Sequence, residues 1–366
     1  MRTHAWTRLL LASCLTLATA CGTSARQLPA GFEGDECLCV ALGVDYMHGV
    51  GSATAIGLPS LRTQLNVAAG GVSGDPVLRY YDGKFYIVNR LAANLTVVDA
   101  STLLVDQQFS VGSDVSNAYD VAVDGRAAWV VYFGEPAVRV FDLDDPAAQP
   151  VQITLPTTAT DVDQNPEAAS IAIVGGKAYV SLQHLEMFMP AANGQIVVID
   201  TASRTVETTI DLPEKNPVNF LRADGAKLYV GATPDFSNNM TGCLARIATG
   251  DSPSADCMTS AVSMGGYVNG IAPAGDGSLF VATAQSFTEG KVVRVAADGS
   301  VDAQAYTAAG QLPTDVAACG KYLVANDTSA GGLRVYDTST RTELTTAALS
   351  VGEPPAFASG IACFSR

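Results

Sequence analysis

Residues 178–212 read AYVSLQHLEMFMPAANGQIVVIDTASRTVETTIDL, and their pattern is that of a small antiparallel sheet. A strand rich in aromatic and β-branched residues comes first, and an apolar run at 196–200 ends in Asp200. Hydroxyl residues follow, because Asp and its Ser or Thr neighbours close turns through local backbone hydrogen bonds. A further strand runs over 205–212, so this stretch predicts three strands joined by short connections.

The same pattern returns along the whole chain. Each unit starts with a short apolar strand and a Gly turn before the aromatic strand, and the units start at Asp75, Asp120, Ser170, Phe220, Gly270, Asp315 and Gly360. The intervals between these residues are 45, 50, 50, 50, 45 and 45. Several strands per unit and a period of roughly 40–50 residues are typical of a β-propeller.

The two ends of the chain supply the parts of one more unit. Six full units run from Asp75 to about Val351, and Gly360 then opens a first strand with nothing after it. At the other end, 37–41 matches 321–325 position for position, and strands at 52–56 and 62–67 follow. We therefore predict an all-β, seven-bladed β-propeller closed by a split blade, with a C-terminal first strand and N-terminal outer strands.

The repeat also resembles a known family. Tyr-Val at 179–180, Val-Val-Ile-Asp at 197–200 and Thr-Ala-Ser-Arg-Thr-Val-Glu-Thr-Thr-Ile at 201–210 are similar to the YVTN (WD40-like) propeller repeat of bacterial lipoproteins. The likeness extends from about Cys37 to the C-terminus and is clearest at 178–212 and 322–351. It implies a propeller of regular, repeated blades.

The first twenty residues have the features of an export signal. Arg2 and Arg8 precede an apolar segment, 9–17, that is too short to span a bilayer. The sequence Leu17-Ala18-Thr19-Ala20-Cys21 resembles a lipobox, which predicts a lipoprotein signal peptide (1–20), acylation of Cys21, a tether (21–36) and a propeller (37–366). The alternative is an ordinary secretory signal cleaved after Ala20. Under the lipobox reading the protein is anchored to the cell envelope, with an outer-membrane location expected.

The charge limits the partners that we expect. The chain carries −15, and removal of residues 1–20 takes away two arginines and no acid, which makes the mature charge −17. An acidic surface excludes nucleic acid and anionic headgroups as natural partners. We expect a monomer that contacts the membrane through its lipid only and meets an envelope or surface protein, or a small ligand.

Six cysteines remain after Cys14 and Cys21 are set aside, and their even number predicts disulfides in an oxidising compartment. Cys243 and Cys257 flank a polar loop and would staple a hairpin. A bond from Cys363 to Cys37 or Cys39 would lock the split blade, and Cys319 occupies the position equivalent to Cys363 in the neighbouring blade.

Polar residues gather where the inner strands begin, at the expected mouth of the central channel. These candidates are Asp75, Asp120, Glu167, Ser170, Asn219, Asn269, Asp315 and Ser359. Oxygen ligands from Asp75, Asp120 and Asp315 around one axis would hold a hard cation such as Ca²⁺. The alternative is that Asp, Asn and Ser start these strands because they cap turns.

No enzyme motif is present: the chain lacks the nucleophile elbow, the Walker loop and the metalloprotease helix. His184 with Glu186 would form half of an acid–base pair, or serve only as a loop feature. Related repeats occur in seven-bladed lactonases, but the catalytic His and Arg of those enzymes have no matching positions here. We therefore predict a non-catalytic binding or scaffold module, with a hydrolase or lyase acting at the channel mouth as the alternative.

Overall fold

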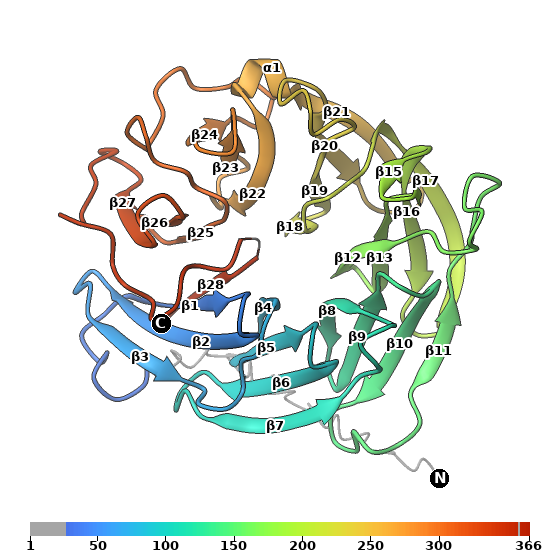
Figure 1. Cartoon of the computed structure of the whole chain (residues 1–366), viewed down its shortest axis with the longest axis horizontal. Helices are drawn as coiled ribbons and strands as arrows, with labels where there is room; N and C mark the ends of the chain where they lie inside the picture. Colours follow the sequence, from blue (N-terminus) through green and yellow to red (C-terminus); the bar gives the residue numbers. More distant parts are fainter. Residues whose placement is uncertain (1–26, 358) are drawn as a thin grey trace, which may run out of the picture.

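The computed structural model describes residues 27–357 and 359–366, and it is built almost wholly from antiparallel strands. Seven sheets stand around a central axis as the blades of a propeller (Figure 1). The all-β, seven-bladed prediction is confirmed. The predicted signal peptide and Cys21 lie outside the described residues.

The first three blades have four strands each. Blade 1 contains β4 (Pro76–Tyr81), β5 (Lys84–Asn89), β6 (Asn94–Asp99) and β7 (Val105–Ser110). Blade 2 contains β8 (Ala118–Asp124), β9 (Ala127–Tyr132), β10 (Ala137–Asp142) and β11 (Val151–Thr154). Blade 3 contains β12 (Ala168–Val174), β13 (Lys177–Leu182), β16 (Asn193–Asp200) and β17 (Thr205–Lys215), with a small hairpin, β14 (Leu185–Glu186) and β15 (Met189–Pro190), between β13 and β16.

The next three blades are less regular. Blade 4 contains β18 (Arg222–Asp224), β19 (Lys227–Ala232), β20 (Cys243–Ala248) and β21 (Ser254–Ser260), followed by α1 (Ala261–Met264). Blade 5 contains β22 (Tyr267–Pro273), β23 (Leu279–Ala284) and β24 (Gly290–Val295), and blade 6 contains β25 (Val316–Cys319), β26 (Tyr322–Asp327) and β27 (Gly332–Asp337). In both, isolated bridges stand where an outer strand would pair. Within the described ranges, no helix has the length and apolarity to cross a bilayer.

Blade 7 is assembled from both ends of the chain, as predicted. Its order is β28 (Ile361–Ser365), β1 (Cys37–Asp45), β2 (Val50–Leu58) and β3 (Thr63–Val67). The inner strand β28 pairs antiparallel with β1, with Cys39 opposite Cys363. Because β28 fills the innermost position, the ring has no open edge between its first and last segments.

Two disulfides lock this closure. Cys39 is bonded to Cys363 within blade 7, which confirms one of the two predicted forms of the lock, and Cys37 is bonded to Cys319 of blade 6. Cys243 and Cys257 are free thiols, so the predicted staple of that hairpin is wrong in this structure. Burial, together with the neighbouring Cys257, raises the pKa of the Cys243 thiol.

The propeller body begins before Cys37. Leu28 and Phe32 are buried in the apolar cluster shared by blades 7 and 1, and Asp35 accepts hydrogen bonds from the Ser60 backbone N–H and hydroxyl. The part of the predicted tether that the structure describes is therefore packed on the ring.

Apolar clusters between neighbouring blades form the core. The central strands contribute their largest side chains, such as Trp129, Tyr179 and Tyr229, which are fully buried. Burying a side chain of the size of Phe85 contributes roughly 1.5–3 kcal/mol, and such residues recur in every blade. The tight turns between first and second strands need positive φ, which Gly125 (57°) and Gly225 (58°) adopt without strain.

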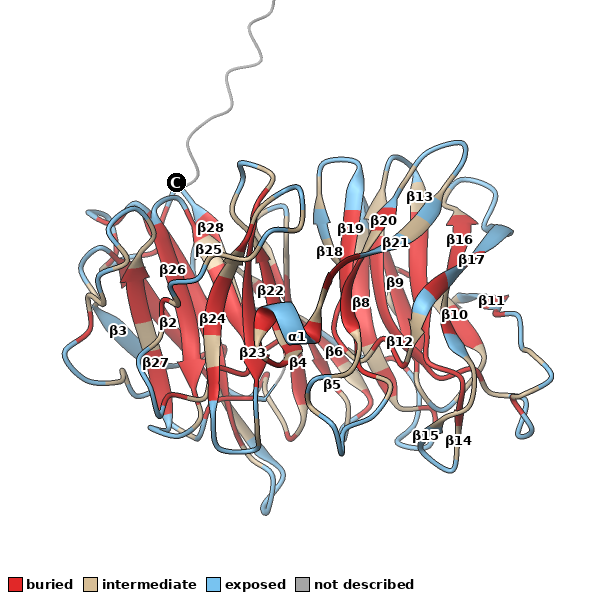
Figure 2. Ribbon diagram, turned by 90° about the horizontal axis from the view of Figure 1, so that it is seen from above, coloured by how far each residue is buried: buried red, intermediate tan, exposed pale blue. Residues whose placement is uncertain are grey.

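The alternation of strands gives the ring two different faces. The loops between second and third strands, and those that enter each inner strand, lie on one side, which we call the loop face. The Gly turns and the turns between third and fourth strands lie on the other, the turn face. In Figure 2, β14 and β15 project from the loop face and the C-terminus lies on the turn face.

Candidate functional site

Three of the predicted channel-mouth residues connect neighbouring blades. Asp120 Oδ2 accepts the backbone N–H of Ile171 at 3.0 Å, and Ser170 Oγ accepts that of Leu221 at 3.0 Å. Asp315 Oδ2 accepts the N–H of Ile361 at 3.0 Å. In each case a short polar side chain at the start of one inner strand binds the inner strand of the next blade.

Other candidates make similar contacts around the axis. Asn219 Nδ2 donates to the Asn269 carbonyl at 2.8 Å, and Asn269 Nδ2 donates to the Pro313 carbonyl at 3.3 Å. The Ser359 carbonyl accepts the N–H of Leu78 at 2.8 Å, which continues the pattern from blade 7 to blade 1. The alternative expected these residues to cap their own turns, whereas these contacts reach the next blade.

A buried ion pair lies at this level of the channel. Arg79 Nη2 is 2.8 Å from Asp120 Oδ1, and both side chains are buried. The guanidinium of Arg79 also lies 4.5 Å from the centre of the Phe220 ring. Asp120 thus satisfies one buried cation and two backbone N–H groups, those of Val121 and Ile171.

A second arginine, Arg222, enters the same region from blade 4. Its Nη2 donates to Ser359 Oγ at 2.9 Å, and Arg79 Nη1 donates to the same oxygen. Its Nε donates to the Ile271 carbonyl at 3.2 Å. Burial, and then the like charge of Arg79, lowers the pKa of Arg222 to about 10, while burial raises the pKa of Asp315.

The three aspartates do not assemble into the predicted cation site. Asp75 lies in the loop before β4 and pairs with Arg90 at 2.7 Å, away from the ring of blade contacts. Across the described residues, no three His, Cys, Asp or Glu side chains come together in a way that would hold a metal ion. The oxygens of Asp120 and Asp315 instead accept backbone N–H groups.

Glu167 lies in the loop that enters β12, and it contacts Leu185 at the start of the β14–β15 hairpin. Its side chain is 5% exposed, and Oε2 accepts the Leu185 N–H at 2.7 Å. Burial, together with the nearby acids Asp163 and Asp161, raises the pKa of Glu167 to about 7, and the hydrogen bond from the Leu185 N–H opposes this shift.

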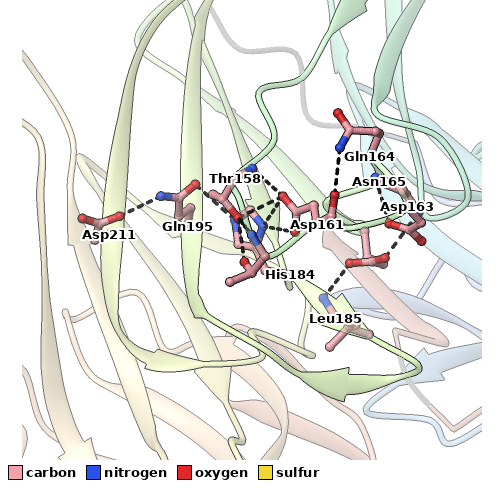
Figure 3. Close-up of polar contacts among 11 residues, drawn as sticks. Thr158, Asp161, Asp163, Gln164, Asn165, His184, Leu185, Gln195 and Asp211 are labelled. Carbon is pink, nitrogen blue, oxygen red and sulfur yellow. Dashed lines mark hydrogen bonds and ion pairs between the residues drawn. The ribbon is translucent and has the colours of Figure 1, made fainter.

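His184 is fully buried at the base of the same hairpin. Its Nδ1 contacts both Asp161 oxygens at 2.9 and 3.0 Å, and its Nε2 lies 3.1 Å from Gln195 Oε1 (Figure 3). Asp161 also accepts the Thr158 N–H at 2.6 Å. Both ring nitrogens are engaged, and the acid beside His184 is Asp161 instead of the predicted Glu186. This arrangement holds the loop and leaves no nitrogen free to move a substrate proton.

The two channel arginines were missed by sequence reasoning, although the repeat contains a signal for them. Arg79 and Arg222 occupy equivalent positions of their inner strands. In blade 4 this position lies two residues after Phe220, the start of the unit. In the other five blades that position is alanine: Ala122, Ala172, Ala272, Ala317 and Ala362. Sequence alignment of the blades can reveal this departure, because a charged residue stands where the other blades have a small residue that lines the axis.

The loop face carries a second feature that the sequence did not suggest. Every methionine and aromatic side chain that is exposed in the described residues lies in its loops: Tyr46, Met47, Met187, Phe188, Met189, Phe236, Met240, Phe287 and Phe357. Met187 and Phe188, at the tip of the β14–β15 hairpin, are each 84% exposed.

Comparison with known proteins shows the fold. No family model and no curated protein matches the sequence. A lactonase-like protein from Bacteroides uniformis, a proposed 6-phosphogluconolactonase, is 14% identical, with a TM-score of 0.64 over 90% of this chain and 100% of that chain. A protein of unknown function from Desulfotomaculum acetoxidans is 13% identical, with a TM-score of 0.59 over 89% and 99% of the two chains. Virginiamycin B lyase from Staphylococcus aureus is 14% identical, with a TM-score of 0.53 over 74% and 83%.

Proposed function

We propose that this protein is an exported, lipid-anchored binding module whose loop face docks a cationic partner that presents apolar side chains, a protein or peptide of the cell envelope. The observation that carries the proposal is the confinement of all exposed methionine and aromatic side chains of the described residues to this one face. Exposed apolar patches mark interaction sites, and methionine adapts to the shape of a partner.

The charge of the loop face supports a cationic partner. The acids that are not buried there are Asp75, Asp114, Glu135, Asp163, Glu186, Asp235, Glu289 and Glu353. In the described loops of this face Arg90 is the one arginine or lysine, and it pairs with Asp75, while Lys215 and Lys291 stand at strand ends that border the face. Complementary charge accelerates encounter and suppresses wrong partners, while the apolar tips supply the contact area.

The disulfides fit an oxidising, exported environment. The lipid anchor on Cys21 and an outer-membrane location are part of the proposal. The described chain begins on the turn face, where Arg366 donates to the carbonyls of Glu36 and Glu33. An anchor a few residues upstream would hold the turn face toward the membrane and leave the loop face free for a partner.

A peptide pair of opposite charge tests the docking proposal. Fluorescence anisotropy would compare an 18-residue Lys/Leu amphipathic peptide with its Glu/Leu counterpart. We expect the Lys/Leu peptide to bind at least tenfold more tightly, and the variant Met187→Ser, Phe188→Ser, Met189→Ser to weaken it at least tenfold. A matched control removes exposed apolar residues outside the loop face, Leu104→Ser with Val105→Ser, and should bind as the wild type does. Equal binding of both peptides, or an unaffected hairpin variant, would rule the proposal out.

None of the side chains described above supports the alternative that the protein is an enzyme. The lyase and lactonase-like proteins share the fold at 13–14% identity, which carries no residue roles to this chain. His184, the residue that sequence reasoning singled out, is held on both nitrogens by Asp161 and Gln195.

A further inference from the structure

The central channel contains a cavity of about 280 Å³. Its walls are contributed by the inner strands of six blades, β4, β12, β18, β22, β25 and β28. In β4, β12 and β22 the lining residues lie from the middle of the strand toward its end, as far as Tyr81, Ile173 and Pro273, where the Gly turns begin. The cavity therefore opens on the turn face, opposite the proposed docking surface.

The walls are mostly aliphatic. The repeated alanine position supplies Ala172, Ala272, Ala317 and Ala362, and the neighbouring positions supply Leu78, Leu221, Ile271, Val316 and Ile361. Because alanine is small, this ring of positions leaves space along the axis. Arg79 and Arg222 interrupt the ring at the same position, and they place guanidinium groups among these walls.

The two guanidinium groups differ in how they are neutralised. Arg79 has a carboxylate partner, Asp120, at 2.8 Å. In the part of the chain that the structure describes, Arg222 donates to two neutral groups, the Ile271 carbonyl and the Ser359 hydroxyl. Among the described residues, no carboxylate oxygen lies within 4.0 Å of Arg222, and its Nη1 makes no hydrogen bond.

An incompletely neutralised cation in such a cavity attracts an anion. Burial and the repulsion of Arg79 lower the pKa of Arg222 to about 10, although the charges of Asp315 and Asp120 compensate in part. Taking a charged group out of water is costly unless an opposite charge compensates it, so an anion beside Nη1 would stabilise Arg222.

We propose that the channel cavity binds a small aliphatic monocarboxylate, whose carboxylate accepts a hydrogen bond from Arg222 Nη1 while its hydrocarbon part lies against the alanine and isoleucine walls. The volume, at the lower end for ligand pockets, limits the ligand to a few carbon atoms. A single charge is expected, because Asp120 already neutralises Arg79 and a second negative group would approach Asp315 and Asp120. This site is independent of the docking surface.

Calorimetric titration with 3-methylbutanoate tests the site, and neutral 3-methylbutanamide serves as the matched probe. Wild-type protein should bind the carboxylate at least tenfold more tightly than the amide, because charge-assisted hydrogen bonds exceed neutral ones. Arg222→Gln should weaken carboxylate binding at least tenfold and leave amide binding unchanged. Lys227→Gln removes a cation from the same blade and face, outside the cavity lining, and should bind as the wild type does.

A steric variant keeps the proposal testable if Arg222→Gln does not fold. Ala223 is exposed and lines the cavity, so Ala223→Phe should fill the cavity and abolish binding of both probes without removing a charge. Wild-type protein that binds acid and amide equally, or does not bind the acid at all, would refute the proposal. Unchanged binding in Ala223→Phe would refute it as well. Peptide docking on the loop face is measured separately, so either proposal can fail alone.

Discussion

Asp120 and Asp315 occupy the same position of the repeat, yet their surroundings give them different roles. Each accepts a backbone N–H from the following blade. Asp120 in addition neutralises Arg79 at 2.8 Å, whereas Asp315 has no arginine or lysine within 4.0 Å among the described residues. The repeat conserves the link between blades, and single side chains around it determine the electrostatics.

Removing the charge of Asp120 should destabilise the ring strongly. In Asp120→Asn the buried guanidinium of Arg79 loses its counter-charge, and we expect a loss of about 3–5 kcal/mol in the free energy of unfolding. Urea denaturation would measure it. The control Asp114→Asn alters an exposed aspartate of the preceding loop and should stay within about 0.5 kcal/mol of wild type. If both variants unfold at the same urea concentration, the Arg79–Asp120 pair contributes nothing.

Glu167 should make stability depend on pH. Its pKa in the folded protein is about 7, above the usual 4.5, so the folded state binds this proton more tightly than the unfolded state does. Its contribution is therefore largest below about pH 4.5 and is lost as pH rises toward about 7. Between pH 5 and 7.5, the Tm of wild type should fall more than that of Glu167→Gln, in thermal melts over a pH series. Glu289→Gln, an exposed glutamate of another loop, should follow the wild type, and parallel curves for all three proteins would contradict the assignment.

Sequence reasoning located residues better than it oriented them. The spacing of Asp120, Ser170 and Asp315 placed them correctly at the starts of inner strands. Asp120 and Asp315 were expected to converge on a cation, but all three side chains point to the next blade, because an inner strand with an unpaired N–H lies there. A repeat pattern fixes which residue stands at a position, whereas the partner across a blade interface depends on the packing of two sheets.

At the level of elements, β28 and β1 are joined by strand pairing and by a disulfide bond. The pair Cys39–Cys363 closes a loop with a sequence separation of 324, and Cys37–Cys319 one of 282. The double variant Cys39→Ala, Cys363→Ala should lower the free energy of unfolding by about 2–4 kcal/mol in guanidinium titration. Cys257→Ala removes an exposed free thiol and should leave stability unchanged. If the Cys39→Ala, Cys363→Ala variant and the Cys257→Ala variant lose the same free energy of unfolding, the Cys39–Cys363 bond does not restrain the ring.

The prediction of elements was best where blades are regular and weakest where the pattern is interrupted. Blades 5 and 6 keep three strands but replace the outer strand by isolated bridges, since outer positions pack against no further blade. The segment before Cys37 was expected as a tether because it has no periodicity. Its Leu28 and Phe32 are nevertheless buried, which only the three-dimensional neighbourhood of blades 7 and 1 determines.

On the scale of the whole molecule, the two faces divide the chemistry. The loop face gathers acids and exposed apolar tips. The turn face gathers the cations of the turns and of the C-terminus: Arg62, Lys84, Arg126, Lys177, Arg204, Lys227, Lys321, Arg341 and Arg366. The same turns carry aspartates, such as Asp142 and Asp144, which pair with Arg126, so this face is mixed in charge. The docking surface and the channel site thus lie on opposite sides of one ring and depend on different side chains.

The ring depends on its last eight residues. β28 pairs with β1 over five residues, Ile361 N–H donates to Asp315, and Phe364 stacks on Tyr80 of blade 1 with ring centres 4.9 Å apart. Deletion of residues 359–366 exposes the edge of β1 and opens the ring, so we expect a loss of more than about 5 kcal/mol, enough to unfold most domains.

Circular dichroism melts would show this loss, and a synthetic peptide of residues 359–366, oxidised onto Cys39, should restore much of the Tm. Deletion of Arg366 alone, an exposed residue outside β28, is the matched control and should melt close to wild type. If the protein without residues 359–366 melts within about 2 °C of the full chain, six blades and an open seventh are stable by themselves. A ΔΔG near 1 kcal/mol already moves the Tm of a large domain by that amount. In that case the split blade would serve to bring the chain ends together rather than to hold the fold.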